Sequence, residues 1–403
     1  MWISSPPVPD SWRSLRRATY PQLLHHLVGH NHRRLGRRSG RAVPDEEREW
    51  VARLYRERYA GFTVKHFHER LVSDHRFNWG YTWTKGVLQA RGLVAKAPRR
   101  GAHRRKRPRR PLVGMMLHQD ASQHVWLSGL GALDLVVTLD DATSAIYSAF
   151  LVEEEGTQSS FRGLAETIAG HGLFCSLYTD RGSHYFHTPE AGGKVDKAAP
   201  TQVGRALAQL GIEHIPAYSP EARGRSERAF RTLQDRLPKE LQLAGIVDDV
   251  AAANRYLRET YIPAHNVRFA VVPAELGSAF VPVEEHQWCD ILCVQVERTV
   301  APDNTVAYDG RRLQIPPHPA RAHFVRAKVR VHDYPDGTMA IFHGPRCLVR
   351  WQPGEIVPPG DDELRVPSAA FGAGGAAAVM AAPSGLAFTA AAPHNKALTS
   401  CAT

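Results

Sequence analysis

The chain has 403 residues, of which 43% are hydrophobic and 23% are charged, a composition typical of a globular protein with room for two or three domains. Its five cysteines are odd in number and lack the spacing of zinc ligands, which excludes a small disulfide-stapled scaffold and a structural zinc site. No stretch resembles a signal peptide or a membrane span, so we expect a cytoplasmic protein without a membrane partner.

The net charge of +11 is concentrated in one part of the chain. Between His75 and Gln119 there are twelve Lys and Arg residues and no Asp or Glu. Removing these twelve from the 51 basic residues leaves 39, against 40 acidic residues. Clustered positive charge on an otherwise balanced protein gains affinity for phosphates through counterion release, so we expect a nucleic-acid partner. A linker whose charge only keeps the chain in solution is the alternative.

The first 95 residues divide into two parts. Residues 1–43 are basic and weakly periodic, and their fold is uncertain. Residues 44–95 show helical spacing of apolar residues in three short segments, with glycines at the expected helix ends. This pattern resembles a helix-turn-helix DNA-binding module, whose third helix would place Lys85, Gln89 and Arg91 in the major groove. A helical bundle without a ligand is the alternative.

Residues 96–111 form an Arg-rich linker interrupted by prolines. Such a segment cannot pack a hydrophobic core, but it suits contact with a phosphate backbone. The candidate contacts are Arg104, Arg105, Lys106 and Arg107.

Residues 112–282 alternate between strand and helix patterns. We predict strands at 112–120, 133–139, 146–153, 173–178 and 212–218, with helices after Ser159 or Ser160, over 201–210 and from Ser226. This order predicts an α/β domain built on a mixed five-stranded sheet.

Three carboxylates stand at positions where such a sheet could bring them together. Asp120 is expected at the end of the first strand, and Asp180 at the end of the fourth. Glu227 lies in the first turn of the helix that follows the fifth strand, at the border of its apolar stripe. Converging carboxylates at strand ends can hold two divalent cations and support phosphodiester chemistry.

Other acidic residues near these positions have different expected roles. Asp140 and Asp141 lie at the junction of a strand and a turn, where we expect them to form the turn. Glu221 lies in a Gly-containing loop rather than on a helix, and we rank it behind Glu227.

The stretches around these residues carry a family resemblance. They are Tyr178-Thr179-Asp180-Arg181-Gly182-Ser183-His184 and the loop and helix from Ala217 through Ser219-Pro220 and Gly224 to Glu227-Arg228. With Asp120 before them, they resemble the catalytic core of integrase-type (DDE) transposases of bacterial insertion sequences, and later residues continue the match to the branch called ISNCY. The interval between Asp180 and Glu227 is longer than in retroviral integrases, and the extra length falls in residues 188–200.

The resemblance implies a ribonuclease-H-like fold in which Asp120, Asp180 and Glu227 bind two Mg²⁺ or Mn²⁺ ions. It also implies double-stranded DNA as the partner, namely the inverted repeats of the element and a target, and a homo-oligomer assembled on that DNA. The implied reaction is hydrolysis of a phosphodiester at the element end, followed by attack of the freed 3′-OH on target DNA. Candidate phosphate contacts are Arg181, His184, Arg228 and Arg231, because Arg pairs well with phosphate.

The C-terminal part changes to strand periodicity. Residues 283–356 predict a small SH3-like β-barrel, in which Arg326, Lys328, Arg330 and His332 alternate with apolar residues and form a cationic face. An ordinary solvated strand face is the alternative. Residues 357–403 are rich in Ala and Gly, and we expect them to be disordered.

The leading hypothesis is therefore a DNA transposase. A catalytically silent DNA-binding remnant or repressor of an insertion sequence is the first alternative, because the first 43 residues are poorly patterned. A ribonuclease-H-type nuclease is the second, although the flanking basic segments suit duplex DNA better than a hybrid.

Overall fold

The computed structural model describes residues 43–96, 107–190, 193–196, 198–218, 224–317 and 321–355. The chain divides into two compact units, Met1–Pro98 and Arg99–Thr403. Several predictions lie outside the described residues: the N-terminal segment up to residue 42, the tail from residue 356, and the positions Arg104, Arg105, Lys106 and Glu221.

The first unit contains the three predicted helices. These are α2 (Asp45–Arg58), α3 (Val64–His75) and α4 (Tyr81–Ala90). Tyr55 and Phe67 pack edge to face at 5.0 Å, and Leu88 of α4 is fully buried. An apolar face on each helix thus holds the unit together, as the spacing of apolar residues predicts.

The second unit is built on a mixed five-stranded sheet, which confirms the prediction. Its strands are β1 (Leu117–His124), β2 (Leu133–Asp140), β3 (Ile146–Val152), β4 (Ser176–Thr179) and β5 (Glu213–Pro216). The order across the sheet is β3-β2-β1-β4-β5. β1, β2 and β3 form an antiparallel meander, whereas β4 is parallel to both β1 and β5.

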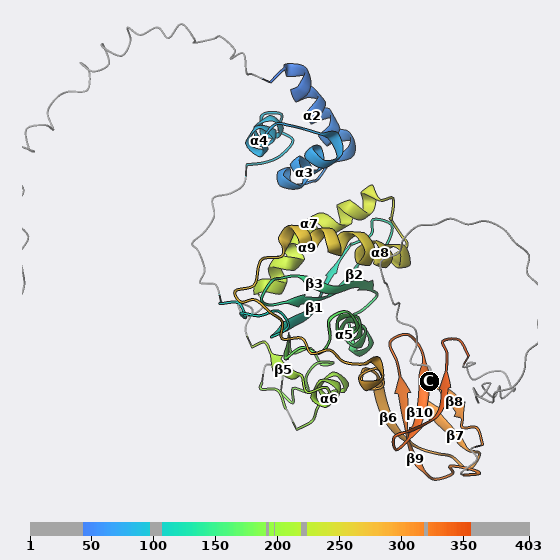
Figure 1. The fold of residues 1–403 in the computed structure, drawn as a ribbon. Helices are drawn as coiled ribbons and strands as arrows, with labels where there is room; N and C mark the ends of the chain where they lie inside the picture. Colours follow the sequence, from blue (N-terminus) through green and yellow to red (C-terminus); the bar gives the residue numbers. More distant parts are fainter. Residues whose placement is uncertain are drawn as a thin grey trace, which may run out of the picture. The chain divides into compact units, whose positions relative to one another are not determined.

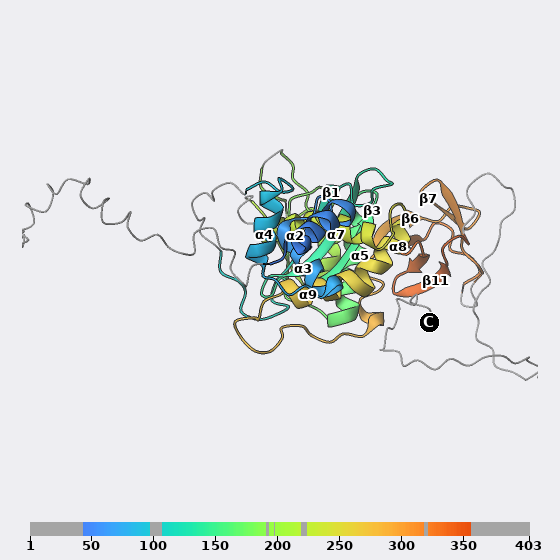
Figure 2. The ribbon, with the colours of Figure 1, turned by 90° about the horizontal axis from the view of Figure 1, so that it is seen from above.

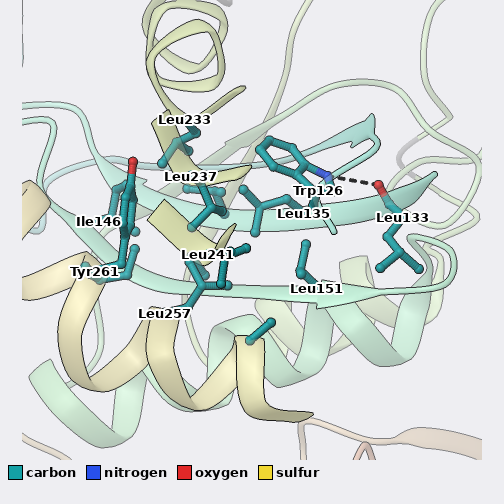
Figure 3. Close-up of a cluster of buried hydrophobic side chains, with 14 of the residues drawn as sticks. Trp126, Leu133, Leu135, Ile146, Leu151, Leu233, Leu237, Leu241, Leu257 and Tyr261 are labelled. Atoms are coloured by element: carbon teal, nitrogen blue, oxygen red, sulfur yellow. Dashed lines mark hydrogen bonds between the residues drawn. The ribbon is translucent and has the colours of Figure 1, made fainter. Parts of the chain in front are cut away.

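Helices cover both faces of this sheet (Figure 1). On one face lie α5 (Thr157–His171) and α6 (Gln202–Gln209), packed on a core that includes Leu117 and Leu177. On the other face lie α7 (Gly224–Leu243), α8 (Val250–Tyr256), the π-helical turn η4 (Leu257–Tyr261) and α9 (Ile262–Phe269). Figure 3 shows the core of this second face, where leucines of α7 meet side chains from β2 and β3.

Alternation along β1 decides which side chains can reach α7. Gln119 belongs to the α5 face, because its side-chain amide donates to Thr138 Oγ1 at 3.1 Å and to the Ser160 carbonyl at 3.2 Å. Asp120 and Ser122 therefore point to the opposite face, which α7 covers.

The C-terminal strands form a four-stranded sheet and a two-stranded sheet, and the predicted SH3-like β-barrel is not confirmed. β6 (Val294–Thr299), β9 (Lys328–Asp333), β10 (Met339–His343) and β11 (Arg346–Trp351) form an antiparallel sheet in the order β11-β10-β9-β6. β7 (Thr305–Tyr308) and β8 (Arg311–Gln314) form a separate hairpin. One hydrophobic cluster joins the sheet and the hairpin, and Figure 2 shows these strands as a group of their own.

No helix in the described part of the chain is both long enough and apolar enough to cross a membrane.

Candidate active site

Asp120 lies on β1, and Asp180 directly follows β4, the strand that runs parallel to β1. β1 and β4 pair with His118 opposite Tyr178. If this register were continued by two residues, Asp120 would lie next to Asp180 on the face of the His118–Tyr178 pair, because alternate residues of a strand share a face. Adjacent strands lie about 4.8 Å apart, so two carboxylates in this relation can share one bound cation.

The backbone around the two aspartates orients their carboxylates. Asp180 Oδ1 accepts a hydrogen bond from the Gly182 N–H at 2.8 Å, and Asp120 Oδ1 accepts one from the Ala121 N–H at 3.1 Å. A side chain at Gly182 would place its Cβ 3.1 Å from both Asp180 Oδ1 and a His184 ring carbon. Glycine therefore allows the close turn that brings Asp180 to its position.

Asp120 lies in the middle of β1, so the predicted strand end is wrong. β1 continues to His124, and its second half pairs with β2 as far as Leu133. The apolar pattern that predicts this strand stops at Asp120, because the residues after it are polar. Ser122 and His124 nevertheless continue the strand, since they pair with β2 through the backbone and face the helical layer. Asp120 is consequently only 7% exposed.

Glu227 lies in the first turn of α7, on the border of its buried stripe as predicted. Its side chain is exposed. Gln234, nearly two helical turns further on, points in the same direction and donates to Ser122 Oγ at 2.8 Å. Since Ser122 and Asp120 share a face of β1, this bond aligns the border of α7 that carries Glu227 with the strand that carries Asp120.

The three carboxylates are not gathered into a finished metal site. Within the residues that the structure describes, no three His, Cys, Asp or Glu side chains lie close enough together to hold an ion. Asp120 is buried and Asp180 half-buried, whereas Glu227 is exposed, and the assignment of these three residues as metal ligands stays a prediction. The oxygen-only donor set nevertheless suits Mg²⁺ or Mn²⁺.

A further carboxylate, Glu155, contacts Tyr185 and His184, which follow Asp180 in the chain, and the sequence interpretation missed it. Its Oε1 accepts from the Tyr185 hydroxyl at 3.3 Å and lies 3.6 Å from His184 Nε2. Burial, and then the charge of Glu155, raises the pKa of Tyr185 well above its ordinary value, and Asp120 and Asp180 add to the effect. The only sequence signal was an acidic run, Glu153 to Glu155, after a strand.

The predicted phosphate contacts near the site differ in their surroundings. Arg228 and Arg231 are exposed on α7. Arg181 donates to the Gly193 carbonyl at 2.6 Å and stacks over the Tyr218 ring at 5.1 Å. His184 faces Glu155 rather than open solvent, with 17% of its side chain exposed.

Asp140, the last residue of β2, and Asp141, which follows it, have separate roles. Asp140 forms the turn as predicted, accepting bonds from the Thr143 N–H at 2.8 Å and the Thr143 hydroxyl at 2.7 Å. Asp141 does more than form a turn, because its buried carboxylate binds side chains from β1, from α7 and from the linker. One of these is Arg107, which was predicted to contact DNA.

Among the predicted contacts on α4, Lys85 and Gln89 are half-buried and lie one turn apart. Arg91 pairs with Glu49 of α2 and, as the largest cause, lowers the pKa of that carboxyl. Part of the charge of Arg91 is therefore neutralised within its own unit.

The predicted cationic face on the C-terminal sheet is only partly present. Arg326, Lys328 and Arg330 are exposed, but Lys328 forms an ion pair of 2.7 Å with Glu297. His332 is buried and stacks on Phe342 at 4.2 Å, so its expected place on the solvent face is wrong.

Comparison with known proteins gives the following matches. No family model matches the chain. A protein of Sinorhizobium fredii named as a transposase, y4bF, is 30% identical over 326 residues, which cover 80% of this chain and 68% of that protein. The transposase for insertion sequence IS1202 of Streptococcus pneumoniae is 26% identical and covers 64% of this chain. The match spans 62% of the length of that transposase.

Solved structures also match, at low TM-scores. An intasome of simian T-cell lymphotropic virus in complex with PP2A regulatory subunit B56 gamma matches 76% of this chain and 98% of that chain, with 14% identity and a TM-score of 0.32. The HTLV-2 integrase catalytic core domain in complex with magnesium matches 37% of this chain and 89% of that chain, with 15% identity and a TM-score of 0.26. The sequence relatives carry the assignment: this chain belongs to the family of insertion-sequence transposases.

Proposed function

We propose that this chain is a DDE transposase, a polynucleotidyl transferase whose ribonuclease-H-like core holds two divalent cations with Asp120, Asp180 and Glu227. The observation that supports the proposal is the register of β1 and β4, in which His118 pairs with Tyr178, two residues before Asp120 and Asp180 respectively. The bond from Gln234 to Ser122, on the border of α7 that carries Glu227, supports the third position.

When bound, Mg²⁺ or Mn²⁺ activates the attacking water and stabilises the leaving oxygen of the phosphodiester. The protein contributes fixed negative charge: the Gly182 N–H orients the Asp180 carboxylate, and burial restricts water around Asp120. Arg228 and Arg231 are exposed on the helix of Glu227, where they can neutralise the phosphate of the DNA. The same site then serves for attack of the 3′-OH on target DNA.

The flanking parts supply DNA contacts in this proposal. Residues 44–95 act as a helix-turn-helix module for the inverted repeats of the element, and the linker 96–111 follows the phosphate backbone. The strands of residues 283–356 add Arg326 and Arg330. Strand transfer joins two element ends, so the chain acts as a homo-oligomer on DNA, in the nucleoid of the cytoplasm.

A supercoiled plasmid that carries the terminal inverted repeats tests the proposal. Wild-type protein with Mg²⁺ is expected to nick the plasmid at the repeat ends, and Asp120→Asn is expected to abolish nicking. Cleavage that survives Asp120→Asn would contradict the assignment of the carboxylates.

The alternative of a silent DNA-binding remnant or repressor has a different outcome. Such a protein would retard repeat DNA in a gel but would never nick it, with either Mg²⁺ or Mn²⁺. The exposed position of Glu227 is the observation that supports this alternative.

A further inference from the structure

The buried carboxylate of Asp141 connects three separate segments of the second unit. Its side chain is 1% exposed. Its Oδ1 accepts bonds from Arg107 at 2.5 Å, from His118 Nε2 at 2.8 Å and from Arg225, while its Oδ2 accepts the Arg110 N–H at 2.7 Å. One carboxylate thus joins the linker, β1 and the first turn of α7.

This junction lies next to the candidate active site. His118 pairs with Tyr178 in the register of β1 and β4, and these two residues lie two positions before Asp120 and Asp180 in the chain. Their rings pack edge to face at 5.1 Å, and the Arg107 guanidinium lies 5.6 Å from the centre of the Tyr178 ring. Asp141 therefore contacts β1 at His118, two residues before Asp120.

The electrostatics show that Asp141 depends on these partners. Burial by itself raises the pKa of Asp141, but the hydrogen bonds from His118 and the Arg110 N–H, together with the charge of Arg225, hold it below its ordinary value. A buried carboxylate that lost its cationic partners would be strongly destabilising. The junction is therefore favourable only when the linker and α7 are both in place.

The linker and α7 also contact each other at this junction. Arg225 Nη2 donates to the carbonyl of Arg107 at 3.0 Å. Arg109 fixes the same stretch of linker to the turn, donating to the carbonyl of Asp141 at 2.9 Å and to Ser144 Oγ at 2.9 Å. A shift of the linker would therefore displace the side chain of Arg225, which lies two residues before Glu227.

We propose that Asp141 is a positioning residue that couples docking of linker residues 107–110 to placement of the first turn of α7, and so of Glu227. The Arg225 contact anchors the border of α7 opposite to Glu227, while the Gln234 contact anchors the border that carries it. DNA bound by the basic residues upstream in the linker would act on Glu227 through this junction. The proposal rests on the proposed function for its catalytic consequence, but its structural part does not.

Hydrogen exchange measured by mass spectrometry on the full chain tests the coupling without any need for activity. Arg107→Gln removes one linker contact to Asp141 from a side chain that is 39% exposed, so the fold is expected to survive. Amides in the first turn of α7 are expected to exchange about tenfold faster, because local opening becomes easier. Arg312→Gln, at a side chain that is 72% exposed on the C-terminal hairpin, is the matched control and should leave α7 unchanged. Unchanged exchange in α7 for Arg107→Gln would overturn the coupling.

The catalytic consequence is tested by the Mg²⁺ concentration that gives half-maximal nicking. Asp141→Asn and Arg225→Gln are each expected to raise it by about 10- to 100-fold, and the double variant by no more than either single one. Asp140→Asn is the matched control, because the buried carboxylate of Asp140 accepts hydrogen bonds from its own turn and from Gly114. This variant should lower the stability of the fold without changing the Mg²⁺ requirement. Two results would overturn the positioning role of Asp141. One is an Mg²⁺ requirement in the double variant that equals the sum of the two single effects on a logarithmic scale; the other is an equal rise in the Mg²⁺ requirement of Asp140→Asn. A wild-type chain that never nicks DNA would overturn the proposed function but not the exchange result.

Discussion

The side-chain amide of Gln234 donates a 2.8 Å hydrogen bond to the hydroxyl of Ser122, and this bond fixes α7 against β1. Ser122 is two residues beyond Asp120 on the same face, and Gln234 is seven residues beyond Glu227 on the same border of α7. The bond therefore fixes the rotation of α7, which in the proposed function turns Glu227 towards Asp120 and Asp180.

Replacing Gln234 by Ala should impair catalysis more than folding. We expect a loss of about tenfold in the nicking rate, as for other positioning contacts of metal sites, with at most about 1 kcal/mol of lost stability. Nicking rates and urea unfolding of the same preparations measure the two effects. Ser122→Ala removes the same bond from the other side and should give a similar loss; a normal rate in both variants would contradict the role of this contact.

The core between α7 and the sheet should determine the stability of the second unit. Leu237 is fully buried among side chains of β2, β3 and η4 (Figure 3). Leu237→Ala is expected to lower the free energy of unfolding by about 2–5 kcal/mol, through lost burial and the cavity left behind. Val267→Ala, at a side chain that is 91% exposed, is the control and should change it by about 0.5 kcal/mol or less. Urea denaturation followed by tryptophan fluorescence distinguishes the two.

His332 should make stability sensitive to mild acid. Burial lowers the pKa of His332 from 6.5 to about 4. Between these values the unfolded chain binds a proton that the folded chain does not, so stability falls as the pH drops from 6.5 towards 4. The slope from this side chain is at most about 1.4 kcal/mol per pH unit.

His332→Gln removes this titration, so its free energy of unfolding should fall less steeply with pH than that of the wild type. Urea denaturation at a series of pH values from 7 to about 4.5 compares the two slopes. The stacking of His332 on Phe342 is lost in the variant, so the slopes are compared rather than the absolute stabilities. Parallel curves would contradict the buried neutral state of His332.

The proposed DNA-binding module makes a prediction about salt dependence. Lys85→Ala should lower the slope of log affinity against log salt concentration by about 0.9, the value for one phosphate contact. Arg91→Ala should lower it by less, because Arg91 already pairs with Glu49. Titrations of inverted-repeat DNA by fluorescence anisotropy at several salt concentrations measure both slopes, and equal slopes in wild type and Lys85→Ala would argue against contact by α4.

The parts of the fold with strong local patterns were predictable from the sequence. β2 and β3 are apolar runs bounded by turn residues, and their observed bounds lie within a residue of those predicted. The second half of β1 was missed because Ser122 and His124 give no apolar signal, although they face a helix across the sheet. His332 was assigned to solvent by alternation, whereas an aromatic partner on the neighbouring strand buries it.

The site was predictable only in so far as its residues lie in local motifs. Asp180 is a candidate because it follows a short apolar strand, and Glu227 is one because it lies in the first turn of a helix with a clear apolar stripe. Glu155 and Asp141 act through contacts with residues far away in the chain, such as Tyr185 and Arg225. No local pattern encodes those contacts, so their roles emerged only from the packed structure.

In the proposed function, Asp120, Asp180 and Glu227 act as one catalytic unit. The most direct test of this claim is the rate at which an end-labelled duplex carrying the inverted repeat is cleaved in Mg²⁺ by Asp120→Asn, Asp180→Asn, Glu227→Gln and the triple variant. We predict that each single variant loses on the order of 10³-fold or more and that the triple variant loses no more than the single ones, because residues that act as a unit are not additive. Retention of near-wild-type cleavage by Glu227→Gln, or losses that add up across the three positions, would contradict the claim.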